Sequence, residues 1–147
     1  MVQEVLKASV RSAVIRDADA VFGLLSQFVV SYVAEREPFD RMFPRLVASP
    51  DANVLVAVHV DTVVGYALAL RVPTLYANGE LWHLQELMVD ADCRCRGIGR
   101  ALLERVVTDA HFEGAVEVVV PSRRAGGFYL KHGFVESAMT YKVKLCE

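Results

Sequence analysis

The sequence carries no surplus of charge of either sign. It has 16 lysines and arginines against 18 aspartates and glutamates, which gives a formal net charge of −2 over 147 residues. This balance provides no general attraction to nucleic acid, so we expect no nucleic-acid partner. A long apolar run is missing as well, because the longest one, residues 54–70, is interrupted by His59 and Asp61. The sequence therefore predicts no membrane-spanning segment and no membrane partner.

Cysteine is scarce, and the few cysteines form no metal-binding pattern. Cys93, Cys95 and Cys146 are an odd number, and the chain opens without a signal-peptide pattern. We therefore expect reduced thiols in a cytoplasmic protein. Cys93 and Cys95 lie close together, but no nearby histidine or second cysteine pair completes a zinc site, so we expect no metal. Whether these two thiols have a redox role is left open.

The composition is globular, with 54% hydrophobic and 23% charged residues, and the length predicts one domain over residues 1–147. Hydrophobic periodicity predicts strands at 9–15, 54–60, 63–71, 81–89, 116–120 and 140–145, and helices from Asp17 or Asp19 to Val29 and at 39–48, 98–110 and 122–133. Pro44 is a candidate break in the second helix. The short join after residue 60 makes 54–71 an antiparallel hairpin, and strand 116–120 is apolar enough for the centre of a sheet. We expect an α/β fold with a mixed, mostly antiparallel central sheet flanked by helices.

A turn rich in arginine and glycine, residues 92–100, joins the predicted strand 81–89 to the predicted helix 98–110. The first N–H groups of a helix have no partner within it and carry partial positive charge. Gly97 and Gly99 lack the Cβ atoms that would keep an anion away from this backbone. Arg94, Arg96 and Arg100 add full positive charge at the same point. The turn therefore predicts a phosphate-binding site.

The spacing of the glycines and arginines in this turn decides which known phosphate-binding pattern it matches. No Walker string occurs, and the dinucleotide pattern Gly-x-Gly-x-x-Gly lacks its third glycine. Arg-x-x-Gly-x-Gly at 94–99 instead resembles the signature of the GNAT N-acetyltransferase superfamily. Residues 125–134 resemble a second segment of that family, Ala-x-x-Phe-Tyr-x-x-x-Gly-Phe, and residues 87–90 resemble its cofactor strand. The resemblance covers residues 54–145 well, and the first 50 residues in element order only.

The resemblance implies a GNAT fold and acetyl-CoA as co-substrate. Backbone groups of Leu87, Met88 and Val89 would pair with the pantetheine arm like an added strand, and one amide would polarise the acetyl carbonyl. Tyr129 would protonate the departing thiolate. Ser122 stands where the family often has an asparagine that touches the pantetheine, and its shorter side chain puts that contact in doubt. The implied cofactor-binding set is Leu87, Met88, Val89, Arg94, Cys95, Arg96, Gly97, Ile98, Gly99, Arg100, Ser122 and Phe128.

The general base is not determined by the sequence. Period-two alternation places His83 and Gln85 on one face of the strand and Glu86 on the other. Some family members have a glutamate at the position of Gln85, and glutamine cannot accept a proton. His83 titrates in a useful range, and a bulge could turn Glu86 inward. His83, Glu86 and an ordered water relay therefore remain as alternatives.

These motifs predict an N-acetyltransferase, of the acyltransferase class, that moves acetyl from acetyl-CoA to a primary amine by direct attack on the thioester. The alternatives are a catalytically silent acyl-CoA-binding module and a nucleotide-binding oxidoreductase. The acceptor, a small molecule or a protein amine, is left open, because residues 28–45 that border its site are weakly patterned. Glu35, Glu37 and Asp40 there suggest a preference for cationic amines. A homodimer is also left open, and Arg123 and Arg124 are candidates for the adenosine 3′-phosphate.

Overall fold

The computed structural model describes residues 4–28 and 32–146. Five strands form one sheet in the order β1-β2-β3-β4-β5. Their bounds are Ser9–Ser12, Ala52–His59, Thr62–Pro73, Glu80–Val89 and Glu117–Val119. The first four strands pair antiparallel, and β5 pairs parallel with β4. The predicted mixed, mostly antiparallel sheet is confirmed.

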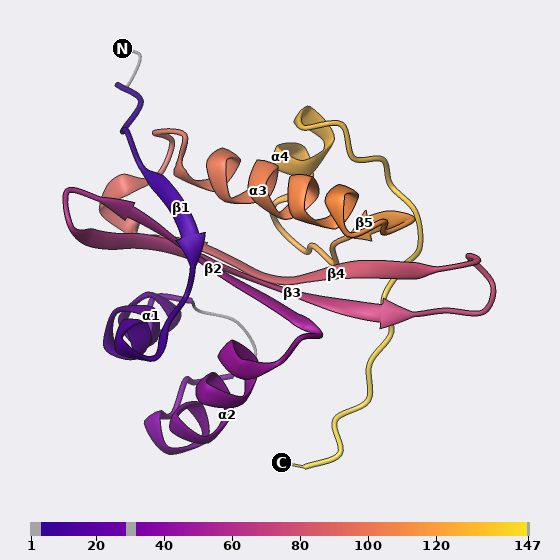
Figure 1. Ribbon diagram of the computed structural model, residues 1–147, viewed down its shortest axis with the longest axis horizontal. Coiled ribbons are helices and arrows are strands. Elements are labelled where there is room, and N and C mark those ends of the chain that lie inside the picture. The colour runs from indigo at the N-terminus through magenta and orange to yellow at the C-terminus, as the bar shows by residue number, and fades with distance from the viewer. Residues whose placement is uncertain (1–3, 29–31, 147) are drawn as a thin grey trace.

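Helices cover both faces of this sheet (Figure 1). Helices α1 (Ala18–Leu25) and α2 (Arg36–Ala48) lie on one face, and α3 (Ile98–Phe112) and α4 (Gly126–Lys131) lie on the other. Two 3₁₀ turns, Ile15–Asp17 and Ala91–Cys93, precede α1 and α3. No helix within the described ranges is long and apolar enough to cross a membrane. The protein is therefore a three-layer sandwich of helices, sheet and helices.

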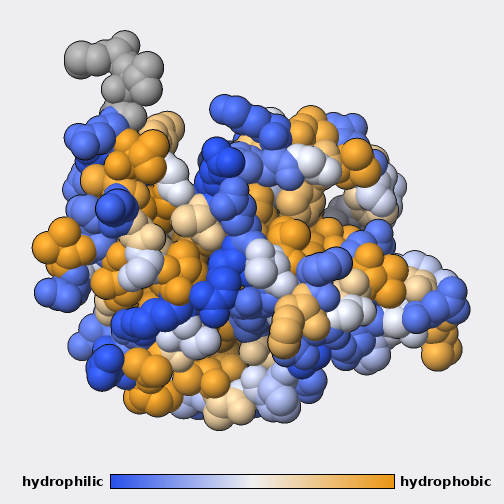
Figure 2. Space-filling model, turned by 45° about the horizontal axis from the view of Figure 1, so that its top comes forward, coloured by the Kyte–Doolittle hydropathy of each residue, from blue (hydrophilic) through white to orange (hydrophobic). Residues whose placement is uncertain are grey.

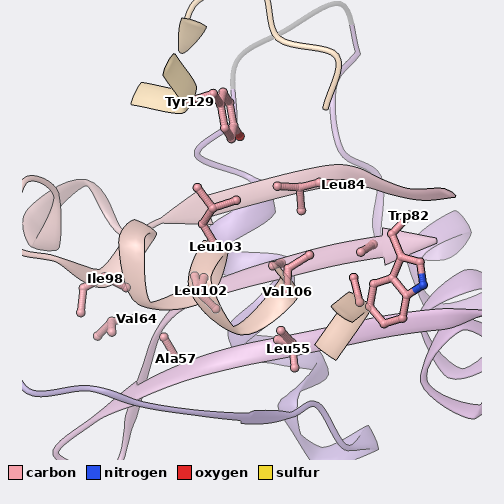
Figure 3. Close-up of a cluster of buried hydrophobic side chains, with 13 residues drawn as sticks. Leu55, Ala57, Val64, Trp82, Leu84, Ile98, Leu102, Leu103, Val106 and Tyr129 are labelled. Carbon is pink, nitrogen blue, oxygen red and sulfur yellow. The ribbon is translucent and has the colours of Figure 1, made fainter. Parts of the chain in front are cut away.

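The α3 face holds the larger of the two hydrophobic cores formed by the described residues (Figure 3). Ile98, Leu102, Val106 and Ala110 follow one another at four-residue steps and are each at most 1% exposed. This is the stripe that the helical period of the sequence predicts. Gly65 on β3 allows the close approach of α3, because a Cβ there would lie 3.0 Å from the side chain of Leu102.

A β-bulge at Gln85 changes the faces of β4. Leu68 on β3 pairs with Glu86, whereas the next residue, Ala69, pairs with Leu84, so Gln85 has no partner on β3. Leu70 pairs with His83. Because Leu68 and Leu70 lie two residues apart, Glu86 and His83 point to the same face, which is the α1–α2 face. The prediction of opposite faces was wrong, since it assumed uninterrupted alternation.

The C-terminal part of the chain departs from the sequence prediction. Strand β5 lies at the edge of the described sheet and not at its centre, and no strand forms at 140–145. Met139, Tyr141, Val143 and Leu145 are each at least 79% exposed. Alternation of apolar residues favours an extended backbone, but a strand also needs a partner, and no described strand pairs with this segment.

Three helix predictions also need correction. Helix α2 begins at Arg36 and continues through Pro44 without a break, with Phe43 packed against the sheet. Helix α4 begins at Gly126 and not at Ser122. Residues 122–125 form a bend instead, in which the Ser122 hydroxyl accepts a bond from the N–H of Ala125 at 3.1 Å. Helix α1 ends at Leu25, and Val29 lies outside the described residues.

Candidate active site

The sheet opens between β4 and β5. Strand β5 pairs only with residues 81–83 of β4, so residues 84–89 have no strand partner on that side within the described chain. Alternate backbone N–H and C=O groups along such an edge are free to bind an extended ligand. The predicted cofactor strand, Leu87, Met88 and Val89, lies in this unpaired stretch. The structure therefore offers the backbone edge that this part of the site needs.

The arginine-rich turn lies between the end of β4 and the start of α3. Cys95 and Gly97 have positive φ angles, 61° and 90°, so the backbone bends sharply immediately before the helix. The N–H of Leu6 donates to the carbonyl of Arg96 at 3.0 Å and ties the turn to the N-terminal segment. The first hydrogen bond of α3 runs from Ala101 to Gly97, which leaves the N–H groups of residues 98–100 outside the helical pattern. This is the geometry of an anion-binding helix start.

The three arginines of the turn have different partners. Arg94 donates to the carbonyl of Val89 at 3.2 Å, and Arg96 donates to that of Glu4 at 3.2 Å. Both partners are uncharged, so these two guanidinium groups keep their net positive charge. Arg100 pairs with Glu104 at 2.8 Å on the exposed side of α3. The turn therefore retains positive charge next to the helix start.

Helix α4 lies against this turn. A Cβ on Gly99 would lie 3.6 Å from the ring of Phe128, and that ring stacks on Tyr129 with centroids 5.2 Å apart. Tyr129 is 8% exposed, and its burial raises the pKa of the phenol, so the hydroxyl stays protonated. Figure 3 shows the hydroxyl end of the Tyr129 ring turned toward the strands. In the space-filling view, the surface is notched between the part that bears the N-terminus and the part that bears α4 (Figure 2).

Glu86 lies on the opposite face of the sheet and is paired with a residue that the sequence analysis missed. The hydroxyl of Tyr66 on β3 donates to the Glu86 carboxylate at 2.7 Å. Tyr66 is 3% exposed, and burial and the Glu86 charge together raise its pKa. The only signal for it was a tyrosine inside an apolar strand, since a buried phenol needs a hydrogen-bond partner. The pair fixes the position of the Glu86 side chain.

A cavity of about 340 Å³ opens in front of Glu86, between α1, α2 and the sheet. Most of its wall is apolar. It is lined by Val21, Leu25, Glu35, Pro38, Phe39, Met42, Phe43, Leu46, Val54, Tyr66, Leu68 and Glu86. The predicted acceptor region, residues 28–45, thus contributes part of α2 to the wall, while its residues 29–31 lie outside the described chain.

Only one member of the predicted acidic cluster lines this cavity. Glu35 does, whereas Glu37 pairs with Arg41 at 3.0 Å and Asp40 pairs with Arg36 at 2.8 Å. The sequence predicted that these acidic side chains would give the acceptor site negative charge. The (i, i+4) pairs neutralise the charges of Glu37 and Asp40. Helix α2 begins at Arg36 and not at the predicted residue 39. Both ion pairs therefore lie within the helix, each between residues one turn apart.

The candidate groups therefore fall into two sets on opposite faces of the sheet. Tyr129 and the turn lie on the α3–α4 face, and Glu86 and the cavity lie on the other. The opening beside residues 84–89 lies between them. His83 shares a face with Glu86 but does not line the cavity, and Arg123 and Arg124 are exposed beyond β5. Across residues 4–28 and 32–146, no three histidine, cysteine or acidic side chains are grouped to hold a metal ion.

Comparisons with known proteins identify the family and the fold. A family model described as an acetyltransferase (GNAT) domain matches residues 50–136. Glucosamine 6-phosphate N-acetyltransferase 1 of Oryza sativa subsp. japonica is 32% identical over 120 residues, which cover 78% of this chain and 72% of that protein.

Two solved structures share the fold. Glucosamine-6-phosphate N-acetyltransferase of Arabidopsis thaliana superposes with a TM-score of 0.83 at 19% identity, covering 95% of this chain and 99% of the other. A transcriptional regulator of Bacillus halodurans C-125 superposes with a TM-score of 0.86 at 19% identity, covering 95% and 100%. At these identities, the structural similarity supports the fold alone.

Proposed function

The chain belongs to the GNAT N-acetyltransferase family and is an enzyme that transfers an acetyl group to an amine, and from this premise we propose how its own residues divide the work. The family uses acetyl-CoA as co-substrate. In this proposal the backbone of Leu87, Met88 and Val89 binds the pantetheine arm along the open edge of β4. The edge is unpaired over residues 84–89, which is the support for this assignment.

The turn before α3 is proposed to bind the pyrophosphate. The N–H groups of residues 95–100 and the charges of Arg94 and Arg96 supply the donors, and Arg100 contributes when it leaves its pair with Glu104. Gly97 and Gly99 keep the surface free of Cβ atoms. Phe128 packs beside Gly99 and forms the wall of this site on the α4 side. The Ser122 hydroxyl accepts a bond from the N–H of Ala125, which leaves its own O–H able to donate to the pantetheine.

We assign the general base to Glu86. Its carboxylate lines the cavity and is held by the hydroxyl of Tyr66, whereas His83 lies on the same face without lining it. A primary amine is mostly protonated at neutral pH and must lose that proton before it can attack. Glu86 is placed to accept it, directly or through one water.

The transfer then proceeds without a covalent enzyme intermediate. The neutral amine attacks the acetyl carbonyl, a C–N bond forms and the C–S bond breaks. A backbone N–H of β4 stabilises the negative charge that develops on the carbonyl oxygen, an effect worth roughly 3–4 kcal/mol for one well-placed donor. Glu86 passes the first proton to solvent, and the amine nitrogen then gives its second proton to Glu86 or to solvent. The thiolate takes a proton from Tyr129, which solvent reprotonates. The products are the amide, the free thiol and one released proton.

One observation carries this proposal: a sheet opened beside β4, with a partly buried carboxylate on one face and a buried phenol on the other. The test is turnover of acetyl-CoA with a panel of primary amines, measured as free thiol and as acetylated amine. Amine-dependent thiol release supports the proposal. Binding of acetyl-CoA without transfer to any amine would instead leave the chain as a silent acyl-CoA-binding module, and preference for NADH over acetyl-CoA would favour an oxidoreductase.

We also propose a homodimer in the cytoplasm. The exposed alternating segment 139–145 and the free side of β5 support the dimer, because a second copy could pair with either. The free state of Cys93, Cys95 and Cys146 agrees with a reducing compartment. Sedimentation of the protein with and without residues 139–147 tests the dimer, and fractionation of the source cells tests the location.

A further inference from the structure

The cavity in front of Glu86 lacks what a phosphorylated sugar requires. Among the described residues that line it, none is lysine, arginine, histidine, serine, threonine, asparagine or glutamine. A phosphate group needs cationic or N–H donors, and no side chain of the described lining provides one. The charged side chains of the lining are Glu35 and Glu86, both of which would repel a phosphate.

Two of the three arginines of α2 are already paired, and none of the three lines the cavity. Arg36 contacts Asp19 at 2.7 Å and Asp40 at 2.8 Å, and Arg41 contacts Glu37 at 3.0 Å. Arg36 also lies over the Phe39 ring, 5.6 Å from its centroid, but does not line the cavity. Neither arginine lines the cavity, so neither supplies a phosphate site there.

The α2 wall is built for an apolar ring. Phe39 and Phe43 are stacked, with centroids 5.1 Å apart and planes 15° apart, and both line the cavity. Met42, 47% exposed, lies beside them at the rim and can adapt to the shape of a ligand. A volume of about 340 Å³ accommodates a small substituted ring rather than a peptide or an oligosaccharide.

We propose that the acceptor is a primary amine carrying an apolar, ring-sized group, an arylalkylamine, and not a sugar phosphate. The Glu86 carboxylate, fixed by Tyr66, attracts the ammonium group, and the ring packs against Phe39, Met42 and Phe43. This inference rests on the proposed function, since it takes the Glu86 side of the sheet as the side from which the amine attacks. The proposed acceptor differs from the one for which the relatives are named, glucosamine 6-phosphate.

The test compares kcat/KM for 2-phenylethylamine and for glucosamine 6-phosphate, both with acetyl-CoA and with release of free thiol as the readout. We expect the arylalkylamine to be preferred by about 100-fold or more, because the sugar phosphate would leave its polar groups unpaired in the cavity. Calorimetry of acetyl-CoA binding is run on the same preparation. It reports on the co-substrate site independently of the acceptor.

A pair of lysine substitutions sharpens the test. Met42→Lys places a cation at the rim of the cavity, and Val107→Lys, at a site 40% exposed on α3, adds the same charge far from it. Met42→Lys should lower kcat/KM for 2-phenylethylamine about tenfold or more and narrow its advantage over glucosamine 6-phosphate, with the Kd of acetyl-CoA unchanged. Val107→Lys should change none of these quantities.

The outcomes that oppose the inference differ from those that oppose the proposed function. Comparable or faster acetylation of glucosamine 6-phosphate overturns the inference and leaves the proposed function intact. An equal effect of Met42→Lys on both amines also overturns it, because the residue would then be acting on folding or on acetyl-CoA. Failure to bind acetyl-CoA overturns the proposed function itself.

Discussion

The two faces of the sheet are built on different principles. On the α3–α4 face, the proposed co-substrate site consists of backbone: an unpaired strand edge, a turn with two positive φ angles and the start of a helix. On the α1–α2 face, the proposed acceptor site consists of side chains around a cavity of about 340 Å³. A site made of backbone needs glycines and arginines at fixed spacing, whereas a site made of side chains can change its ligand through substitutions in one helix.

The largest effect is expected at Tyr129, on the backbone-built face. Tyr129→Phe keeps the ring stacked on Phe128 and removes only the proposed proton donor. The turnover number should fall by roughly 10²–10⁴, with little change in the KM for acetyl-CoA, because the hydroxyl acts as the thiolate forms. Single-turnover acetyl transfer is the appropriate measurement, since product release can hide a chemical defect.

The raised pKa of Tyr129 adds a second readout, which is the pH dependence of acetyl transfer by the parent enzyme. Burial raises the pKa of the phenol, so the donor stays protonated up to and beyond pH 10, its ordinary titration range. Loss of the proton from Tyr129 should therefore not limit the parent enzyme between pH 8 and 10. If the folded Phe variant transfers acetyl within about threefold of the parent, water protonates the thiolate and Tyr129 serves packing.

The next largest effect is expected on the cavity face, where substitutions of two candidate general bases are compared. Glu86→Gln should lower kcat by about 10²-fold, and Tyr66 can still donate its hydrogen bond to the amide oxygen of the variant. His83→Gln should change kcat by less than about threefold. Both variants should bind acetyl-CoA normally in calorimetry, since neither residue belongs to the turn. The reverse order of the two effects would assign the base to His83, and two small effects would leave the water relay.

A smaller effect tests the turn. Gly99→Val places a branched side chain against Phe128, where a Cβ alone already lies 3.6 Å from the ring. Charge-assisted hydrogen bonds contribute roughly 1.5–3 kcal/mol each, so the loss of even one should raise the Kd of acetyl-CoA at least tenfold. Gly23→Val on α1, with no atom within 4 Å of its Cβ position, is the matched control. Equal affinity in a folded Gly99→Val protein would contradict the proposed pyrophosphate site.

The substitution with the smallest expected effect on catalysis is at Asp17, which links β1 to α1. Its expected effect is on the stability of the folded protein. Its carboxylate is 5% exposed and pairs with Arg11 at 2.8 Å, and this hydrogen bond and charge lower the pKa of Asp17. Asp17→Asn should reduce the free energy of unfolding by about 1.5–3 kcal/mol.

Because the pKa is lowered in the folded state, the stabilisation is complete above the unfolded-state value of about 3.9 and is lost as the pH falls through the folded-state value. Urea unfolding at pH 7 and pH 3 measures the difference between parent and variant. Asp19→Asn, at a 90% exposed side chain, should cost little at either pH. A parent and variant that differ equally at both pH values would contradict the ionic origin.

The sequence predicted the backbone-built half of the molecule well. The hairpin, β4, the turn and α3 were expected within a few residues of their observed bounds, because periodicity, glycines and arginines report local backbone geometry. The family and its acetyl transfer followed from the same motifs, and the family model confirms them. The residue roles themselves stay predictions for the experiments above.

The cavity face was harder to predict, for physical reasons. The bulge at Gln85 depends on pairing with β3, which lies about 15 residues away in sequence, and it decides which face Glu86 occupies. The Tyr66–Glu86 hydrogen bond depends on that bulge in turn. At the other end of the chain, residues 139–145 have the alternation of a strand without a partner in the described sheet, so a local pattern predicted a pairing that the fold does not supply.

The opening between β4 and β5 also bears on how the folded state is held together. Over residues 84–89 the sheet lacks one neighbour, and in our proposal the pantetheine arm takes that place. Acetyl-CoA is then part of the hydrogen-bonded framework as well as a reactant, and its binding to the folded chain alone adds RT ln(1 + [L]/Kd) to the stability, about 2.7 kcal/mol at a hundredfold excess over Kd. The concentration of this metabolite would thus regulate how long the protein survives unfolding and proteolysis. In this proposal, the stability of the folded chain would rise with the concentration of its own co-substrate.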